Sequence, residues 1–559
     1  MEQQMYKVQI DGEERSFPAG TTYLQIAGEY QERYPHDIVL VYVNGKLQEL
    51  GKKLKKDCEL QFVTTGETIG NLTYRRGVSF LLVKAVYDTI GHDKIEQVRI
   101  HFSVDKGYYC TIKGDQKLDQ ELLARIEERM HEMADMDLSI RKRSVHTDEA
   151  VEMFRKYGMK DKERLFRYRR VSTVNIYSIN EFEDYYYGYM VPSTGYLKYF
   201  KLYLYDEGFV VQMPEAAEPE KIPPFQPQNK LFHVLKESTR GGDMLGIETV
   251  GALNDYVTGG SANPKELLLV QEAMQEKKIA QIAEQIAGNP QKKFVLIAGP
   301  SSSGKTTFSR RLSIQLRVSG LVPHPISVDD YFKNRVDTPL DAEGKPNYEC
   351  LEALDVELFN HDMNELLAGK RVNLPVFNFK TGKREWKGKK LRLEKDSVII
   401  AEGLHALNPV MLPENVDMAR IFRLYVSPLL PLNLDDHNRI PTSYLRLLRR
   451  IVRDYETRGS SVQHTLSMWE SVQQGEKRWI FPFQENADMI FNSSTLYELA
   501  VLKKHIYPLL AAVQPEESCY DEVQYIVKIL DYIQEANVDD EIPPTSLIRE
   551  FIGGNTFYR

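Results

Sequence analysis

Residues 294–306 read FVLIAGPSSSGKT, and this stretch decides the fold of the central part of the chain. The apolar run 294–298 is typical of a buried strand, and Thr307 to Arg317 has helical character. The residues between them match the spacing GxxxxGK[ST], in which glycines let successive backbone N–H groups point at phosphate oxygens. The helix that follows adds its positive N-terminal end. The stretch therefore predicts a nucleoside-triphosphate site at the edge of a parallel α/β sheet.

The residue types of this loop give its members separate tasks. Lys305 is expected to reach the β- and γ-phosphates, and the Thr306 hydroxyl to ligate Mg²⁺. The residues expected to bind ATP are Gly299, Ser301, Ser302, Ser303, Gly304, Lys305, Thr306 and Thr307.

Two acids follow predicted strands further along the chain. Asp329 comes after Ile326–Val328, and Glu402 comes after Val398–Ala401. The carboxyl ends of such strands lie at the edge of the sheet where ligands bind. We expect Asp329 to accept the proton of an attacking hydroxyl, and Thr306, Asp329 and Glu402 to hold Mg²⁺, partly through water.

An arginine-rich stretch follows with helical spacing. Its members are Arg446, Arg449, Arg450 and Arg453, with Arg458 just after. Residues three and four apart share one face of a helix, so the pattern predicts a lid whose guanidinium groups neutralise phosphate charge. We predict catalytic roles for Arg449 and Arg453 beside Lys305 and Asp329, and ATP contacts for Arg450 and Arg458. A solvated basic helix paired with Asp454 and Glu456 is the alternative.

Several ordered motifs resemble the uridine–cytidine kinase and phosphoribulokinase family over about residues 294–495. Besides the phosphate loop they are SVDDYF (327–332), NYE (347–349), EALD (352–355), PVFNF (375–379), EGLHAL (402–407), RLLRR (446–450) and RD (453–454). The resemblance implies an ATP- and Mg²⁺-dependent kinase acting on the 5′-hydroxyl of a ribonucleoside, with uridine as the default acceptor. It implies that Asp329 activates this hydroxyl, that Glu349 holds ribose hydroxyls and that Arg446 lies on the substrate side. We expect the acceptor to contact Asp329, Tyr331, Glu349, Phe377, Arg384 and Arg446.

The chain departs from the family pattern at three positions on the acceptor side. Glu349 stands where the nucleoside kinases usually carry Asp, Phe377 where they carry Tyr, and Gly382 where a base-contacting His would fall. The segment 378–390 also contains Lys380, Lys383, Arg384, Lys387, Lys389 and Lys390. A phosphoribulokinase-like enzyme with a sugar-phosphate acceptor is therefore one alternative, and an RNA- or tRNA-sensing regulator that binds nucleotide is another.

The front half resembles the N-terminal part of threonyl-tRNA synthetase. Short alternating strands around one helix predict a β-grasp unit over residues 1–65, similar to the TGS domain. Residues 66–225 are similar to the second additional (editing-type) domain, whose metal ligands would fall at Arg76, Phe80, Tyr186 and Met190. Such side chains are poor ligands or none, so we predict that the editing chemistry is lost. Basic and aromatic runs at 141–143, 167–170 and 185–187 suggest RNA contact.

The whole chain is predicted to be a multidomain protein: 1–65 β-grasp, 66–225 α+β editing-like, 226–290 a connector with a helix at Pro264–Ala287, 291–500 an α/β kinase domain with a parallel sheet, and 501–559 a helical tail. Its 559 residues carry 72 Lys and Arg against 80 Asp and Glu, and this net charge of −8 disfavours bulk binding of nucleic acid. We expect no membrane span and no secretory signal. Four scattered cysteines fit a reducing cytoplasm, and an oligomer is compatible with the sequence.

Overall fold

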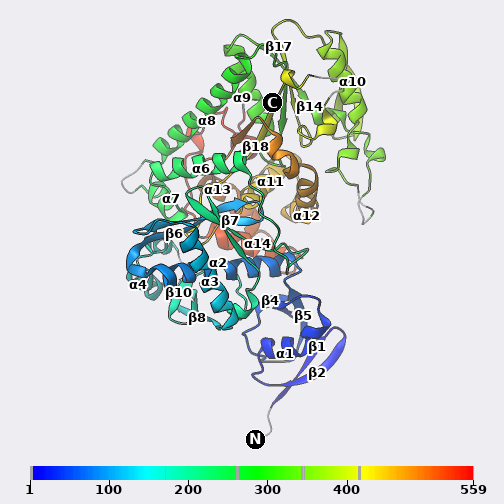
Figure 1. Ribbon diagram of the computed structural model, residues 1–559. Coiled ribbons are helices and arrows are strands. Elements are labelled where there is room, and N and C mark those ends of the chain that lie inside the picture. The colour runs from blue at the N-terminus through cyan, green and yellow to red at the C-terminus, as the bar shows by residue number, and fades with distance from the viewer. Residues whose placement is uncertain are drawn as a thin grey trace. The chain divides into compact units, whose positions relative to one another are not determined.

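The computed structural model describes residues 4–169, 171–259, 263–340, 344, 346–412 and 417–557. The chain forms two compact units. The first unit contains residues 1–228 together with 433–439, and the second contains 229–432 and 440–559. Figure 1 labels the elements of both. Among the described residues no helix is long and apolar enough to span a bilayer.

A five-stranded parallel sheet lies at the centre of the second unit. Its order is β14 (Val322–Ser327), β17 (Ser397–Glu402), β13 (Phe294–Ala298), β18 (Ile421–Ser427) and β19 (Met489–Asn492). All five residues of β13 are buried, as a strand covered on both faces requires. The parallel α/β architecture predicted for this part of the chain is confirmed.

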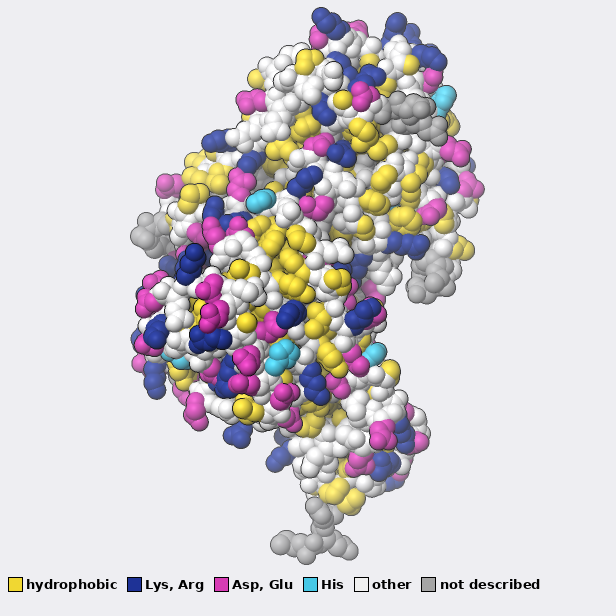
Figure 2. Space-filling model, viewed as in Figure 1, with side chains coloured by type: hydrophobic (Ala, Val, Ile, Leu, Met, Phe, Trp, Pro, Cys, Tyr) yellow, Lys and Arg dark blue, Asp and Glu magenta, His cyan; other side chains and the backbone are white. Residues whose placement is uncertain are grey.

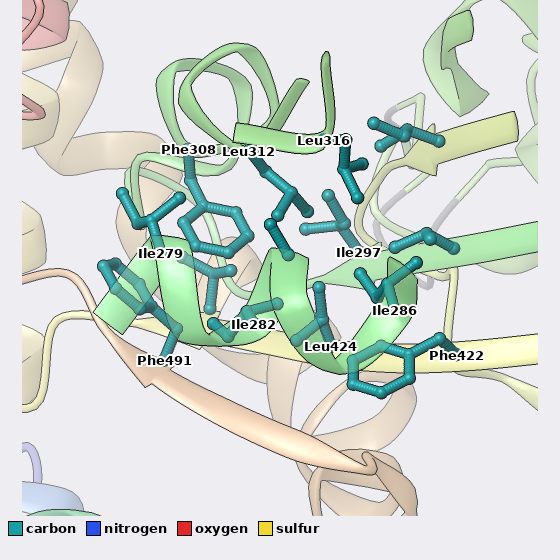
Figure 3. Close-up of a cluster of buried hydrophobic side chains, with 14 of the residues drawn as sticks. Ile279, Ile282, Ile286, Ile297, Phe308, Leu312, Leu316, Phe422, Leu424 and Phe491 are labelled. Atoms are coloured by element: carbon teal, nitrogen blue, oxygen red, sulfur yellow. The ribbon is translucent and has the colours of Figure 1, made fainter. Parts of the chain in front are cut away.

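Two long helices cover the sheet beside β13. They are α8 (Pro264–Ala287), whose bounds agree with the predicted helix, and α9 (Lys305–Val318). Figure 3 shows side chains of both helices in one apolar cluster with the strands. Ile279, Ile282 and Ile286 of α8 are at most 1% exposed. The helix predicted as part of a connector is thus built into the core of the second unit.

The remaining helices and strands of the second unit surround this core. They are α6 (Asn229–Met244), α7 (Val250–Val257), α10 (Val356–Leu367), the hairpin β15 (Val372–Asn378) and β16 (Lys383–Leu391), α11 (Thr442–Arg458), α12 (Val462–Trp479), α13 (Glu498–Ala511), α14 (Tyr520–Leu530) and α15 (Arg549–Ile552).

The first unit begins with a five-stranded mixed sheet around one helix. The sheet runs β2 (Glu13–Pro18), β1 (Met5–Ile10), β5 (Cys58–Thr64), β3 (Ile38–Val43), β4 (Lys46–Glu49). The helix of this unit, α1, covers Tyr23–Tyr30, and a 3-10 turn follows. Thr22 fixes its start with a capping box to Gln25.

The rest of the first unit contains two further antiparallel sheets. One is β11 (Lys201–Tyr205), β12 (Gly208–Gln212), β7 (Gly107–Gly114), β6 (Ile95–Val104), and the other is β10 (Phe182–Tyr185), β9 (Thr173–Ile179), β8 (Ile140–His146). Its helices are α2 (Thr68–Ile90), α3 (Gln120–Asp135), α4 (Thr147–Lys156) and α5 (Lys160–Arg167).

Candidate functional site

The phosphate loop connects β13 to α9, as the sequence predicts. Gly304 has a left-handed backbone (φ 84°) and is the N-cap of α9. Gly299 is required for a different reason, because a Cβ there would lie 2.0 Å from the carbonyl oxygen of Val426. These two glycines let the loop turn tightly at the end of the central strand.

The Lys305 ammonium lies within the curve of the loop. Its Nζ donates to the carbonyl oxygens of Gly299 (2.9 Å) and Pro300 (3.1 Å). Burial lowers the pKa of Lys305, while the charges of Glu402 and Asp329 oppose that shift. A buried ammonium next to the N-terminus of a helix is suited to an anionic ligand.

The two predicted acids come from neighbouring parallel strands. Glu402 is the last residue of β17, opposite Ser327 of β14, and Asp329 lies in the 3-10 turn (Val328–Tyr331) that follows β14. The Thr306 hydroxyl donates to Glu402 Oε1 at 3.3 Å. Burial raises the pKa of Glu402 to about 7, with the Asp329 charge adding to the shift, and burial also raises the pKa of Asp329.

These residues fit a divalent cation. A hydroxyl and two carboxylates are the hard oxygen donors that Mg²⁺ prefers. The raised pKa values show that the acids lack full compensation of their charge by protein groups. A bound cation would supply that compensation.

Two arginines of α11, Arg446 and Arg450, lie at the phosphate loop, and two others contact Asp454. Arg450 Nη1 donates to the Ser301 hydroxyl at 2.9 Å, whereas Arg453 and Arg458 gather on the carboxylate of Asp454. Arg446 is paired with Glu476 and lies 3.5 Å from the Ser301 carbonyl oxygen.

Arg449 has a deeper position than its predicted catalytic role implies. Its side chain is 0% exposed and forms a two-pronged ion pair with Glu498. Nη1 donates to the carbonyl oxygen of Ser302 in the loop at 3.3 Å. This guanidinium therefore supports the phosphate loop through a contact with its backbone.

Two residues predicted to contact the acceptor are Glu349, which lies near Arg450, and Phe377, which lies in an aromatic cluster. Burial raises the pKa of Glu349 to about 7, and the charge of Arg450 opposes this shift. The Phe377 ring packs edge-on against Phe332 and Phe379, and its N–H donates to Asp330 at 3.1 Å.

Tyr331, Arg384 and Gly382 are occupied by structural contacts. The Tyr331 side chain is 0% exposed and its hydroxyl donates to Asp362 of α10, while Arg384 pairs with Asp355 at 2.8 Å. Gly382 has a left-handed backbone (φ 67°), and a Cβ there would lie 2.8 Å from Arg335 Cβ. The histidine of the family pattern therefore does not fit this turn.

Three polar residues near the phosphate loop are not predicted from the sequence. Glu476 accepts the Ser301 N–H at 3.0 Å, and Glu550 accepts the Thr307 N–H at 3.0 Å. His405 is 2% exposed and lies edge-on to Trp479, and burial lowers its pKa to about 4, so its ring is neutral. The histidine belongs to the EGLHAL motif (402–407), but nothing in that motif predicts a place for it near the loop.

In the first unit, the positions matched to metal ligands are filled by packing and hydrogen bonds. Arg76 donates to the carbonyl oxygen of Tyr189 at 2.6 Å, and the rings of Phe80 and Tyr186 lie 5.1 Å apart. Met190 is 2% exposed.

A buried charged network occupies the same unit. Lys162 lies 3.2 Å from Asp184 and 3.4 Å from Asp435, and His437 accompanies them. Asp435 and His437 belong to the segment 433–439, which the chain inserts between β18 and α11. No local pattern in the sequence indicates this long-range contact.

The predicted RNA surface of the first unit is partly wrong. Tyr185, Tyr186 and Tyr187 are between 2% and 7% exposed, so they pack in the core and cannot stack on bases. Arg143 is paired with Glu149 and Glu183, and Arg170 lies outside the described residues. Figure 2 shows basic and acidic side chains intermixed over the visible face.

A phosphate loop on a parallel sheet, with two acids at the strand ends, defines a nucleotide-binding protein of the phosphate-loop class. The model of the Phosphoribulokinase / Uridine kinase family matches residues 294–500. The uridine kinase of Ligilactobacillus salivarius is 32% identical over 195 residues, which are 35% of this chain and 82% of that protein. The chain belongs to the phosphoribulokinase/uridine kinase family.

Other comparisons concern the front half and the fold. The threonine–tRNA ligase of Desulforamulus reducens is 30% identical over 200 residues, 35% of this chain and 31% of the ligase. The chain thus spans about a third of the length of the ligases it matches. A solved structure described as a possible uridine kinase of Bacillus stearothermophilus is 20% identical, with a TM-score of 0.24, covering 36% of this chain and 88% of that one.

Proposed function

We propose that the protein is an ATP- and Mg²⁺-dependent kinase that transfers the γ-phosphate to the 5′-hydroxyl of a ribonucleoside. One observation carries the proposal: Lys305, Thr306, Asp329 and Glu402 converge at the carboxyl edge of one parallel sheet. Phosphoryl transfer needs a cation at the phosphates, a cation-binding set of oxygens and a base for the acceptor, and this edge supplies all three.

In this mechanism Asp329 removes the proton from the acceptor hydroxyl. The hydroxyl oxygen forms a bond to the γ-phosphorus as the bond to the β–γ bridging oxygen breaks, and ADP carries the electron pair away. Lys305 and Arg450 stabilise the charge that develops on the phosphoryl oxygens. Thr306, Asp329 and Glu402 would hold Mg²⁺, which supplies further neutralisation when bound.

The surroundings of the residues expected to contact the acceptor support a nucleoside over a charged acceptor. Arg384 is neutralised by Asp355, and Phe377 with Phe379 offers an aromatic wall to a base. Glu349 would accept hydrogen bonds from ribose hydroxyls. The exposed lysines of β16, which include Lys387, Lys389 and Lys390, favour a sugar phosphate, and this acceptor class is the second candidate.

For the front half, we propose a TGS-like unit over residues 1–65 and an editing-like unit over 66–225 that lacks metal-dependent chemistry. The support is the likeness to the ligases together with the packed positions of Arg76, Phe80, Tyr186 and Met190.

The test is a panel of ribonucleosides and sugar phosphates with ATP and Mg²⁺, run beside Asp329→Asn. We expect phosphorylation of at least one ribonucleoside and a fall in kcat of about 100-fold or more for the variant, the scale of general-base catalysis. Activity on a sugar phosphate but on no nucleoside would establish the second candidate. Full activity of Asp329→Asn would contradict the proposed base.

A further inference from the structure

The N-terminus of α9 presents three backbone N–H groups to a ligand. Phe308 N–H bonds to the Gly304 carbonyl oxygen at 3.0 Å, so the intrahelical ladder starts there and the N–H groups of Lys305, Thr306 and Thr307 lie before it. The Thr307 N–H is taken by Glu550 Oε2 at 3.0 Å. A carboxylate oxygen at this place has the charge and the acceptor geometry of a phosphate oxygen.

Glu550 belongs to the C-terminal segment, residues 546–557, which is anchored on the loop at several points. Asn555 Nδ2 donates to the Thr307 hydroxyl at 3.1 Å. Phe551 is 0% exposed under the guanidinium of Arg449, 4.8 Å from its ring centre. Leu547 joins the apolar cluster of the sheet. Figure 1 shows this end of the chain beside the strands of the second unit.

Glu550 differs in its charged neighbours from Glu476, the other carboxylate that accepts a hydrogen bond from a loop N–H. Glu476 accepts the Ser301 N–H but is neutralised by Arg446. Glu550 adds negative charge close to Lys305 and Glu402. A triphosphate brings several more negative charges to the same place, and one N–H cannot donate well to two acceptors.

We propose that the C-terminal segment is an autoinhibitory plug: Glu550 occupies a phosphate-binding N–H group of α9, and a nucleoside triphosphate must displace it. The inference rests on the proposed nucleotide binding. The segment and the site that it covers both lie within the second unit.

The experiment measures the Kd of the full chain for a non-hydrolysable ATP analogue with Mg²⁺. Glu550→Ala is expected to bind about three- to tenfold tighter than the wild type, because the nucleotide no longer has to displace a side chain from the Thr307 N–H. Glu550→Gln keeps an acceptor without the charge and should lie between the two. Glu535→Gln is an exposed control in the same region and should match the wild type.

Hydrogen exchange supplies an independent readout. In the wild type, the amides of residues 547–557 should exchange faster when the analogue is bound, because the segment is released. Equal or weaker binding by Glu550→Ala, or slower exchange of the segment with the analogue, overturns the plug while leaving nucleotide binding intact. Loss of binding in the wild type and in Glu550→Ala alike overturns both proposals.

Discussion

At the scale of single residues, the first unit holds an ammonium group with no exposure to solvent. Lys162 lies 3.2 Å from Asp184, 3.4 Å from Asp435 and 3.8 Å from Asp161. The acids together outweigh the burial that would otherwise lower its pKa, and they hold it above its usual range. Removing one partner of such a group leaves uncompensated charge in a dry environment.

We therefore expect Lys162→Met to destabilise the first unit by about 3 to 5 kcal/mol, the usual cost of breaking a buried ion pair from one side. The measurement is the shift in the urea unfolding curve of the full chain. Lys160→Met, on the same helix but exposed, is the matched control and should change stability little. Similar curves for both variants would contradict the account.

A second residue has a distinctive titration. Partial burial raises the pKa of Tyr108, but the charges of Arg75 and Arg439 outweigh this effect and lower the pKa to about 8. Arg75 Nε donates to the phenol oxygen at 3.2 Å, and the Arg439 guanidinium lies 4.4 Å from the ring centre.

The ultraviolet absorbance of tyrosinate should therefore rise by one tyrosine with a midpoint near pH 8. Tyr108→Phe should remove this step, whereas Tyr109→Phe should keep it, because burial raises the pKa of Tyr109. Since the folded pKa of Tyr108 lies below the unfolded value, ionisation favours the folded state, and stability should increase as the pH rises above 8. A wild type without the step would refute the assignment.

At the scale of elements, α8 acts as part of the sheet's cover. Ile282 is 1% exposed and lies in the cluster with Phe308 of α9 and Leu424 of β18. Ile282→Ala should cost about 2 to 5 kcal/mol in the second unit, from lost burial and the cavity that remains. Thermal unfolding measures it, with exposed Leu269→Ala on the same helix as control. An unchanged second unit would show that α8 is only a connector.

The sequence predicts the arrangement of the phosphate loop and the two acids at the sheet edge because each of its parts is local. The loop spacing, the buried strand before it and an acid after each neighbouring strand are visible within a few residues, and parallel strands bring their ends together. Thr306 and Glu402 meet for this reason, although they are 96 residues apart.

The contacts that the sequence does not predict follow no such local pattern. Glu550 reaches the loop across 243 residues and Glu476 across 175, and neither follows a strand or belongs to a motif. The sequence also does not predict that Tyr185, Tyr186 and Tyr187 are buried, because a run of aromatic residues occurs both on surfaces and in cores. Such placements depend on tertiary packing.

At the scale of the whole molecule, one short segment belongs to a different unit from its neighbours in the sequence. Residues 433–439 follow β18 of the second unit in sequence but pack in the first unit. Asn433 donates to the carbonyl oxygens of Ile100 and His101, both at 2.9 Å, and Asn438 donates to that of Tyr185. Six of its members from Asn433 to Asn438 are at most 7% exposed.

A chain of residues 229–559 alone would lack every one of these partners. We expect it to be cleaved by trypsin after Arg439, whereas the full chain resists cleavage there, because buried and hydrogen-bonded backbone is a poor protease substrate. Limited proteolysis followed by mass spectrometry locates the cut. Cleavage at exposed Arg392 should be alike in both chains and serves as the reference. Equal resistance at Arg439 would mean that the segment is held without the first unit.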